Sequence, residues 1–312
     1  MPGGKRKQSP VAKSPKTKRP KVALKTASSP VPVPHSISLL NTGGNGVFPR
    51  PKVHILSWNV NGFKAWVKKP AVDSVYSRPD LDLFILNETK LQEAAVPAAR
   101  QHFESLYPYQ YWTCSTTKKG YSGVAVMSKT EPVAVGYGLG EEVQVDEGRA
   151  VTVEFRDFFV LATYVPNAGQ KLERLTYRTQ DWDSDLRKYL QALESLGKPV
   201  IWLGDLNVVH QDIDIFSMKG KAKCAGCTEA ERTSFTETLA LGFADTFREK
   251  YPDKVQFSWF SGMRASSKAE NEGWRLDYVV VSRSLLGKVE DSLIYSEVDG
   301  SDHVPIEVVL GL

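Results

Sequence analysis

Short apolar runs alternate with polar and helical stretches along the chain from Lys52 onward. Runs of this length, rich in β-branched and aromatic residues, predict strands. Eight strands are expected, at residues 53–58, 82–87, 122–128, 150–155, 158–164, 199–204, 276–282 and 304–310. Apolar residues at helical spacing predict an amphipathic helix over about 172–196, and a capping box formed by Thr228 and Glu231 predicts a second helix that ends near Leu241. The pattern therefore predicts one domain over 51–312, an α/β sandwich of two packed sheets with helices outside.

The first 50 residues have a different composition. They are rich in Pro, Ser, Lys and Gly, show no hydrophobic period, and contain ten Lys and Arg but no acid. Such a composition predicts a disordered basic tail. Basic clusters at residues 5–7 and 16–21 have the spacing of a bipartite nuclear import signal, so a nuclear location is expected. A solubilising tail that attracts DNA without specificity is the alternative.

Composition narrows the class of protein. Hydrophobic residues make up 41% and charged residues 24%, and no apolar run approaches the roughly 18 residues of a membrane span. The chain beyond the tail has 30 Lys and Arg and 36 acids, which gives it a net charge of −6. It therefore needs a local basic groove to bind a polyanion. Three cysteines make no disulfide framework, and Cys224 and Cys227 form a lone C-x-x-C to which we assign no function. We expect a monomer.

Polar side chains stand at the ends of the predicted strands. Asn59 and Asn61 follow the first apolar run, and Asp205 and Asn207 follow a later one, each pair at the i, i+2 spacing that puts both side chains on one face of a strand. Further members of this set are Glu88, Lys90, Tyr164, Asn167, Asp277, Asp302 and His303. One such ending would be an ordinary loop, whereas six predict a polar site at the strand ends, where α/β proteins bind ligands.

The residue types of this set indicate which chemistry the site can perform. It offers hard oxygen ligands without a cysteine or multi-histidine set, which favours Mg²⁺ or Mn²⁺ over Zn²⁺. It also has one histidine beside Asp302, and amide and phenol groups that can hold phosphoryl oxygens. Metal-assisted phosphodiester hydrolysis needs these parts.

The motifs SWNVNG, LNETK, TYVPNAG, GDLNVVH, GWRLDY and GSDHVP resemble those of the exonuclease III / AP endonuclease family over about residues 53–312. The resemblance implies a four-layered α/β sandwich with two mixed sheets. It also implies a nuclear, Mg²⁺-dependent endonuclease of base excision repair, which binds double-stranded DNA and cuts 5′ to an abasic site. Accessory 3′-phosphodiesterase and 3′→5′ exonuclease activities are expected. A paralogue specialised as a 3′→5′ exonuclease and a noncatalytic DNA-binding scaffold are the alternatives.

The resemblance also implies metal-binding and phosphate-binding roles. Glu88 is expected to be the principal metal ligand, with Asn61 and Asp302 nearby. Nuclear animal members usually have Asp at position 61, so Asn61 is expected to weaken metal binding without abolishing it. His303 is expected to contact the phosphate, with its orientation fixed by Asp277.

Water activation is implied for a second group of residues. Asp205 is expected to activate the water and Asn207 to position it, while Tyr164 and Asn167 contact the target phosphate and Asn59 ties the network together. Asp205, His303 and the metal all remain candidates for the group that takes the proton.

Two further sets are expected to contact DNA. Lys64, Lys90 and Arg275 are candidates for phosphate contacts. Gln170 stands where the animal enzymes have an Arg that inserts into DNA, and the segment 257–272 diverges from the family pattern. The resemblance assigns Trp274 and Leu276 to the pocket for the baseless sugar, which either Trp259 or Phe260 completes.

Overall fold

The computed structural model describes residues 3, 37–70, 72–140, 143–262 and 266–312. The described residues from 37 onward belong to one compact unit. The basic clusters of the expected import signal lie outside the described residues. Residues 37–50, which the composition assigned to the tail, contribute a strand at Leu40–Asn41 and a core side chain, Phe48.

The larger sheet has seven strands. Their order is β1 (Leu40–Asn41), β6 (Ala134–Tyr137), β7 (Ala150–Glu154), β8 (Phe159–Tyr164), β9 (Val200–Asp205), β13 (Asp277–Ser282) and β10 (Phe243–Asp245). Strands β8 and β9 are parallel and the other neighbours are antiparallel. The sheet is therefore mixed, as predicted.

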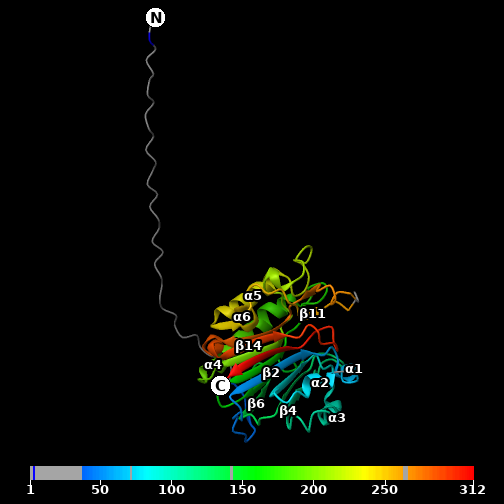
Figure 1. The fold of residues 1–312 in the computed structure, drawn as a ribbon, viewed down its shortest axis with the longest axis vertical. Helices are drawn as coiled ribbons and strands as arrows, with labels where there is room; N and C mark the ends of the chain where they lie inside the picture. Colours follow the sequence, from blue (N-terminus) through cyan, green and yellow to red (C-terminus); the bar gives the residue numbers. More distant parts are fainter. Residues whose placement is uncertain (1–2, 4–36, 71, 141–142, 263–265) are drawn as a thin grey trace. The chain divides into compact units, whose positions relative to one another are not determined.

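The second sheet has six strands and is also mixed. Their order is β14 (Val289–Ile294), β15 (Ile306–Gly311), β2 (Lys52–Asn59), β3 (Leu83–Asn87), β5 (Val124–Ser128) and β4 (Tyr109–Thr113). Only β2 and β3 run parallel. Figure 1 shows β2, in blue, near the red C-terminal end of the chain, and the two are paired along six residues. A short hairpin of β11 (Trp259–Phe260) and β12 (Gly273–Trp274) completes the strands.

All eight predicted strands are present. The pattern missed seven others within the described residues, of which β6 is a four-residue interior strand. Four of them, β1, β10, β14 and β4, are the outermost strands of the two sheets, and β11 and β12 have two residues each. An edge strand is partly exposed and carries polar residues, as in the sequence VEDSLI of β14, so its apolar run is broken. The edge strand β4 has the sequence YQYWT, in which Gln110 interrupts the apolar run although its side chain is buried.

The helices are short except for two. Helix α5 (Glu229–Ala240) begins at the predicted capping box, where the Thr228 hydroxyl accepts a bond from the Glu231 amide. The helix predicted over 172–196 is regular only as α4 (Asp183–Ser195), because a π-helical turn, η2 (Tyr177–Trp182), precedes it. The remaining helices are α1 (Phe63–Trp66), α2 (Val72–Tyr76), α3 (Val96–Gln101), α6 (Thr246–Lys250), and the 3₁₀ turns η1 (Glu93–Ala95), η3 (Asp212–Asp214) and η4 (Arg283–Lys288).

Alternation along the strands makes the four layers. In β2, Ile55 points into the cluster between the sheets, whereas Leu56 points into the cluster under α1, α2 and α3. In β9, Leu203 joins the cluster between the sheets, and Trp202 packs outward with Leu190 of α4. Each fully buried side chain of this size contributes about 1.5–3 kcal/mol. Both faces of each sheet are thus covered, and the polar strand ends form the site.

No helix within the described ranges has both the length and the apolar composition that crossing a bilayer requires.

Candidate active site

Strand register brings the polar strand ends together. Tyr164 pairs with Asp205 across β8 and β9, and Asp205 pairs with Asp277 across β9 and β13. In the other sheet, Asn59 of β2 pairs with Asn87 of β3. Because parallel strands end at the same edge and β13 begins where β9 ends, these side chains lie side by side.

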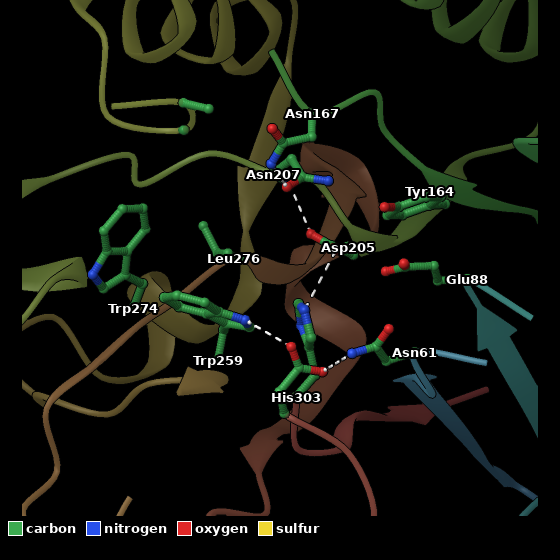
Figure 2. Close-up of a pocket in the computed structure, with 13 residues that line it drawn as sticks. Asn61, Glu88, Tyr164, Asn167, Asp205, Asn207, Trp259, Trp274, Leu276 and His303 are labelled. Carbon is green, nitrogen blue, oxygen red and sulfur yellow. Dashed lines mark hydrogen bonds and ion pairs between the residues drawn. The ribbon is translucent and has the colours of Figure 1, made fainter. Parts of the chain in front are cut away.

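The strand ends surround a cavity of about 220 Å³. Eleven of the predicted site residues line it, namely Asn61, Glu88, Tyr164, Asn167, Asp205, Asn207, Trp259, Trp274, Leu276, Asp302 and His303, together with Ala225 and Gly226. Figure 2 shows Trp274, Leu276 and Trp259 on one side and Tyr164 and Glu88 on the other, with Asp205 and His303 between them. The cavity therefore has an apolar wall and a polar wall.

The two i, i+2 pairs form the same local turn. The Asn59 side-chain oxygen accepts a bond from the Asn61 amide at 3.0 Å, and the Asp205 carboxylate accepts one from the Asn207 amide at 2.9 Å. Such turns let the backbone leave the strand, and Asn tolerates the left-handed conformation that follows, with φ of 47° at Asn61 and 49° at Asn207. Glu88 also has a positive φ (56°), a conformation that Glu rarely adopts. Residues held in such rare backbone conformations cluster at functional sites.

Asp205, His303 and Asp277 form a buried acid–base group. The Nδ1 of His303 lies 2.8 Å from Asp277 Oδ2, and its Nε2 lies 3.8 Å from Asp205 Oδ2. Burial alone would lower the pKa of His303, but the Asp277 carboxylate and then Asp205 outweigh it and raise that pKa. Burial raises the pKa of Asp205, and the charge of His303 opposes this only in part. Ser258, which the sequence analysis missed, donates to Asp277 Oδ2 at 2.6 Å and so fixes that carboxylate.

Asn59 joins the two sheets at the site. Its side-chain nitrogen donates to Glu88 Oε2 at 3.0 Å and to Asp205 Oδ2 at 2.8 Å. Tyr164 stands beside these two carboxylates, and burial followed by their charges raises its pKa well above the usual range. On the far side of Asp205, the Asn207 side-chain oxygen accepts a bond from Asn167 at 2.9 Å. A continuous polar network thus runs from Glu88 to Asn167.

The donor set that was predicted to hold a metal fits a hard cation. Asn61 donates to Asp302 Oδ1 at 3.0 Å, and Glu88 lines the same cavity. The Lys90 ammonium lies 2.9 Å from Glu88 Oε1 and also donates to the Asn61 side-chain oxygen. The oxygens of Glu88 and Asn61 therefore already share one positive charge, and carboxylate and amide oxygens are ligands that Mg²⁺ accepts. Lys90 was expected to contact DNA phosphate, but its ammonium is held at this donor set.

The apolar wall is built by the hairpin. Trp259 and Trp274 pair across β11 and β12, and their rings pack edge to face with centroids 5.2 Å apart. The Trp259 indole also donates to Asp302 at 3.2 Å, which ties the apolar wall to the polar one. Leu276 completes the wall. Phe260, the alternative to Trp259, is buried in the core between the sheets and does not line the cavity.

Arg275 is a correction to the predicted DNA contacts. Its side chain is 0% exposed, and its guanidinium donates to Asp214 at 2.8 Å and to Asp245 at 2.7 Å and 3.1 Å. Arg275 is therefore part of a buried structural ion-pair network, and its guanidinium cannot reach a phosphate. Lys64 is exposed on α1, and Gln170 lines a separate groove of about 740 Å³ that adjoins the cavity through Asn167.

Arg149 is a supporting residue that sequence reasoning missed. It is 1% exposed, donates to the Tyr164 carbonyl at 2.9 Å, and lies 4.8 Å from the centre of the Tyr164 ring. It thereby fixes the orientation of Tyr164. No polar strand end or motif near Arg149 signals this contact, because it depends on the pairing of β7 with β8.

Known proteins share this fold and these motifs. A family described as Endonuclease/Exonuclease/phosphatase matches residues 56–303. DNA repair nuclease APEX1 of Danio rerio is 48% identical over 258 residues, which span 83% of this chain and 82% of that protein. Exodeoxyribonuclease of Bacillus subtilis (strain 168) is 43% identical over 83% of this chain and 99% of that protein. The crystal structure of AP endonuclease LMAP from Leishmania major matches with a TM-score of 0.76 at 29% identity, over 85% of this chain and 90% of that one.

The chain belongs to the Endonuclease/Exonuclease/phosphatase family and, within it, to the exonuclease III / AP endonuclease group. The resemblance of its motifs and the predicted two-sheet sandwich are both confirmed.

Proposed function

We propose that the protein is a magnesium-dependent AP endonuclease of base excision repair, which hydrolyses the phosphodiester 5′ to an abasic site in double-stranded DNA. The enzyme class, a DNA-(apurinic or apyrimidinic site) endonuclease, follows from family membership and from the 48% identical DNA repair nuclease. The proposal rests on one observation: Asp205 and His303, whose ring is held by Asp277, line the same cavity as an apolar wall.

The polar wall supports hydrolysis of a phosphodiester. Asp205 accepts bonds from Asn59 and Asn207, which leaves its carboxylate oriented to hold a water and take its proton. His303, held protonated by Asp277, donates to a non-bridging phosphate oxygen as negative charge develops there. Tyr164, whose raised pKa keeps its hydroxyl protonated, supplies a second donor.

A divalent metal fits the remaining part of the cavity. Glu88, with Asn61 and Asp302, would hold it, and when bound it would neutralise phosphate and leaving-group charge. We propose Mg²⁺, with Mn²⁺ as a substitute, because the donors are carboxylate and amide oxygens.

The apolar wall supports selection of an abasic site. The wall is formed by two indole rings and an aliphatic side chain, Trp259, Trp274 and Leu276, and the Trp259 indole N–H already donates to Asp302. We propose that this wall receives an extruded sugar without a base. Extrusion also costs least where base pairing has already been lost.

Accessory 3′→5′ exonuclease activity is a second candidate. Gln170, at the edge of the adjoining groove, supplies no charged side chain to hold an internal site, and a polar neutral residue there favours release and action at ends. We propose that incision remains the main activity because the apolar wall is intact. A nuclear location and a monomeric state complete the proposal, the first resting on the basic clusters of residues 5–7 and 16–21.

A comparison of two substrates tests the proposal. The protein is incubated with Mg²⁺ and a 5′-labelled duplex that contains one internal tetrahydrofuran abasic analogue, beside an intact duplex with a recessed 3′ end. We expect one internal cut, whose 3′ end a DNA polymerase extends directly, and no cut when EDTA is present. Shortening of the recessed end without internal incision would replace the proposal with the exonuclease alternative. Binding without cleavage would support a scaffold.

A further inference from the structure

The C-x-x-C segment, to which the sequence analysis assigned no function, forms a tight turn beside the cavity. The amide of Cys227 donates to the carbonyl of Cys224 at 3.0 Å. Such a bond between residues i and i+3 holds their Cα atoms within about 7 Å, and disulfides need about 4.4–6.8 Å. Ala225 and Gly226, which lie between the two cysteines, line the cavity.

The two side chains contact the same apolar cluster. Cys227 is 1% exposed and belongs to a buried cluster with Leu276, while Cys224 is half-buried and packs against that cluster together with Trp274. Burial, followed by the neighbouring Cys224 thiol, raises the pKa of Cys227 to about 12. The third cysteine, Cys114, belongs to the different cluster on the outer face of the six-stranded sheet.

We propose that Cys224 and Cys227 are a modification site, a dithiol that hydroperoxides convert to a disulfide, and that this disulfide slows cleavage in the adjoining cavity. The second half rests on the proposed function. The first half does not, since it concerns only the two thiols.

The reaction with hydrogen peroxide balances as two displacements. The thiolate of Cys224, the more exposed cysteine, attacks one peroxide oxygen, the O–O bond breaks, and hydroxide leaves and takes a proton to become water. The sulfur of Cys227 then attacks the Cys224 sulfenic acid, the S–O bond breaks, and a second water leaves with the thiol proton. Two thiols lose two electrons and two protons, and one peroxide yields two waters.

The turn is coupled to the site through its backbone. The Gly226 amide donates to Glu231 at 2.9 Å, and its carbonyl accepts from Val209 at 2.7 Å. A methyl group placed on Gly226 would lie 3.3 Å from the Asn207 carbonyl oxygen. The turn therefore packs directly on Asn207, two residues after Asp205. Gly226 has a φ of 82°, which other residues rarely adopt.

Disulfide formation would disturb this packing. The two sulfurs must approach to about 2.05 Å, well inside non-bonded contact distance, so at least one cysteine leaves its position against the cluster. Because a shift of about 1 Å at a catalytic group costs up to about 100-fold in rate, and Asn207 is one contact away from the turn, we expect a loss on the order of tenfold.

Mass spectrometry tests the first half. The Cys114→Ser variant is treated with hydrogen peroxide, quenched with catalase, alkylated with iodoacetamide and digested with trypsin. Trypsin cuts after Lys223 and Arg232, so both cysteines fall in one peptide, residues 224–232. We expect this peptide to become lighter by two hydrogen atoms, without alkyl groups, and to return to the dialkylated form after dithiothreitol. Two alkylated thiols after peroxide treatment would overturn the proposal.

Incision rates test the second half. Rates on the abasic duplex are measured for the oxidised protein relative to the same protein after dithiothreitol, in the Cys114→Ser background with and without Cys224→Ser. We expect a reversible loss on the order of tenfold only where Cys224 is present. A complete disulfide without a change in rate, or an equal loss in the Cys224→Ser variant, would contradict it. Failure of the reduced protein to incise would instead refute the proposed function, while the mass measurement would still stand.

Discussion

Replacement of Asn61 by Asp adds one negative charge to the proposed metal site and changes little else. Asp tolerates the left-handed backbone at this position as Asn does, so the turn after β2 should persist. The Asn61 side chain now donates to Asp302 and accepts from Lys90. In the variant the first contact becomes a carboxylate pair, which a divalent cation relieves, and the second becomes an ion pair, which competes with that cation.

The magnitude follows from these two opposing changes. Asn61 is exposed, so a water-like dielectric applies, and a unit charge about 4 Å from a divalent ion contributes about 2 kcal/mol. The stronger contact of Lys90 with the new carboxylate returns about 1 kcal/mol of this to the metal-free state. The net gain is about 1 kcal/mol, which corresponds to an approximately fivefold lower half-saturating concentration of Mg²⁺.

Two titrations measure this shift. The single-turnover incision rate is determined against Mg²⁺ concentration for the wild type and the Asn61→Asp variant, and direct binding of Mn²⁺ is followed by electron paramagnetic resonance without DNA. Asn61→Gly is the matched control, because glycine suits the positive φ and removes the ligand, so its half-saturation point should move to higher concentration. An unchanged half-saturation point in Asn61→Asp would show that Asn61 is remote from the metal and would refute the account of the SWNVNG motif.

Three other predictions follow from the same structure. Burial raises the pKa of Asp205, so kcat/KM should rise with pH well above the ordinary Asp range. Asp277 raises the pKa of His303, so kcat/KM should fall again only in alkali, and Asp277→Asn should move this alkaline limb to lower pH. An unmoved limb would exclude His303 as its source. Arg275→Ala should lose about 3–5 kcal/mol of unfolding free energy in urea, since it leaves the buried Asp245 carboxylate without its cation and Asp214 with Arg248 alone. A loss under about 1 kcal/mol would contradict the assignment. Deletion of residues 1–36, which spares β1, should leave incision of a short duplex intact and abolish nuclear accumulation of a fluorescent fusion. Continued accumulation would refute the import signal.

The sequence predicted the interior of the fold well because buried strands carry uninterrupted apolar runs. The strands β2, β3, β8 and β9 were all identifiable, and the polar residues that end them predicted where the site would form. Edge strands could not be found in this way, because one side of each lacks a partner and polar residues interrupt the pattern.

The residues of the site could be predicted from the sequence better than the contacts they make. Asp205 and His303 were predicted from their position and residue type. The DNA-contact role predicted for Arg275 was wrong, because the motif does not reveal the two acids with which its side chain pairs. Those acids, Asp214 and Asp245, are distant in sequence. Arg149 was missed for the same reason, since its contact with Tyr164 exists only once the strands have paired.

Asp205→Asn keeps the shape of the side chain and removes the carboxylate that we propose takes the proton from water. The measurement is the single-turnover incision rate on the abasic duplex at saturating Mg²⁺, with the melting temperature and the affinity for that duplex recorded on the same preparation. We expect a loss of about 100-fold or more in rate, with folding and binding retained. A folded variant that binds the duplex and incises it at the wild-type rate would contradict the assignment of this cavity as the active site.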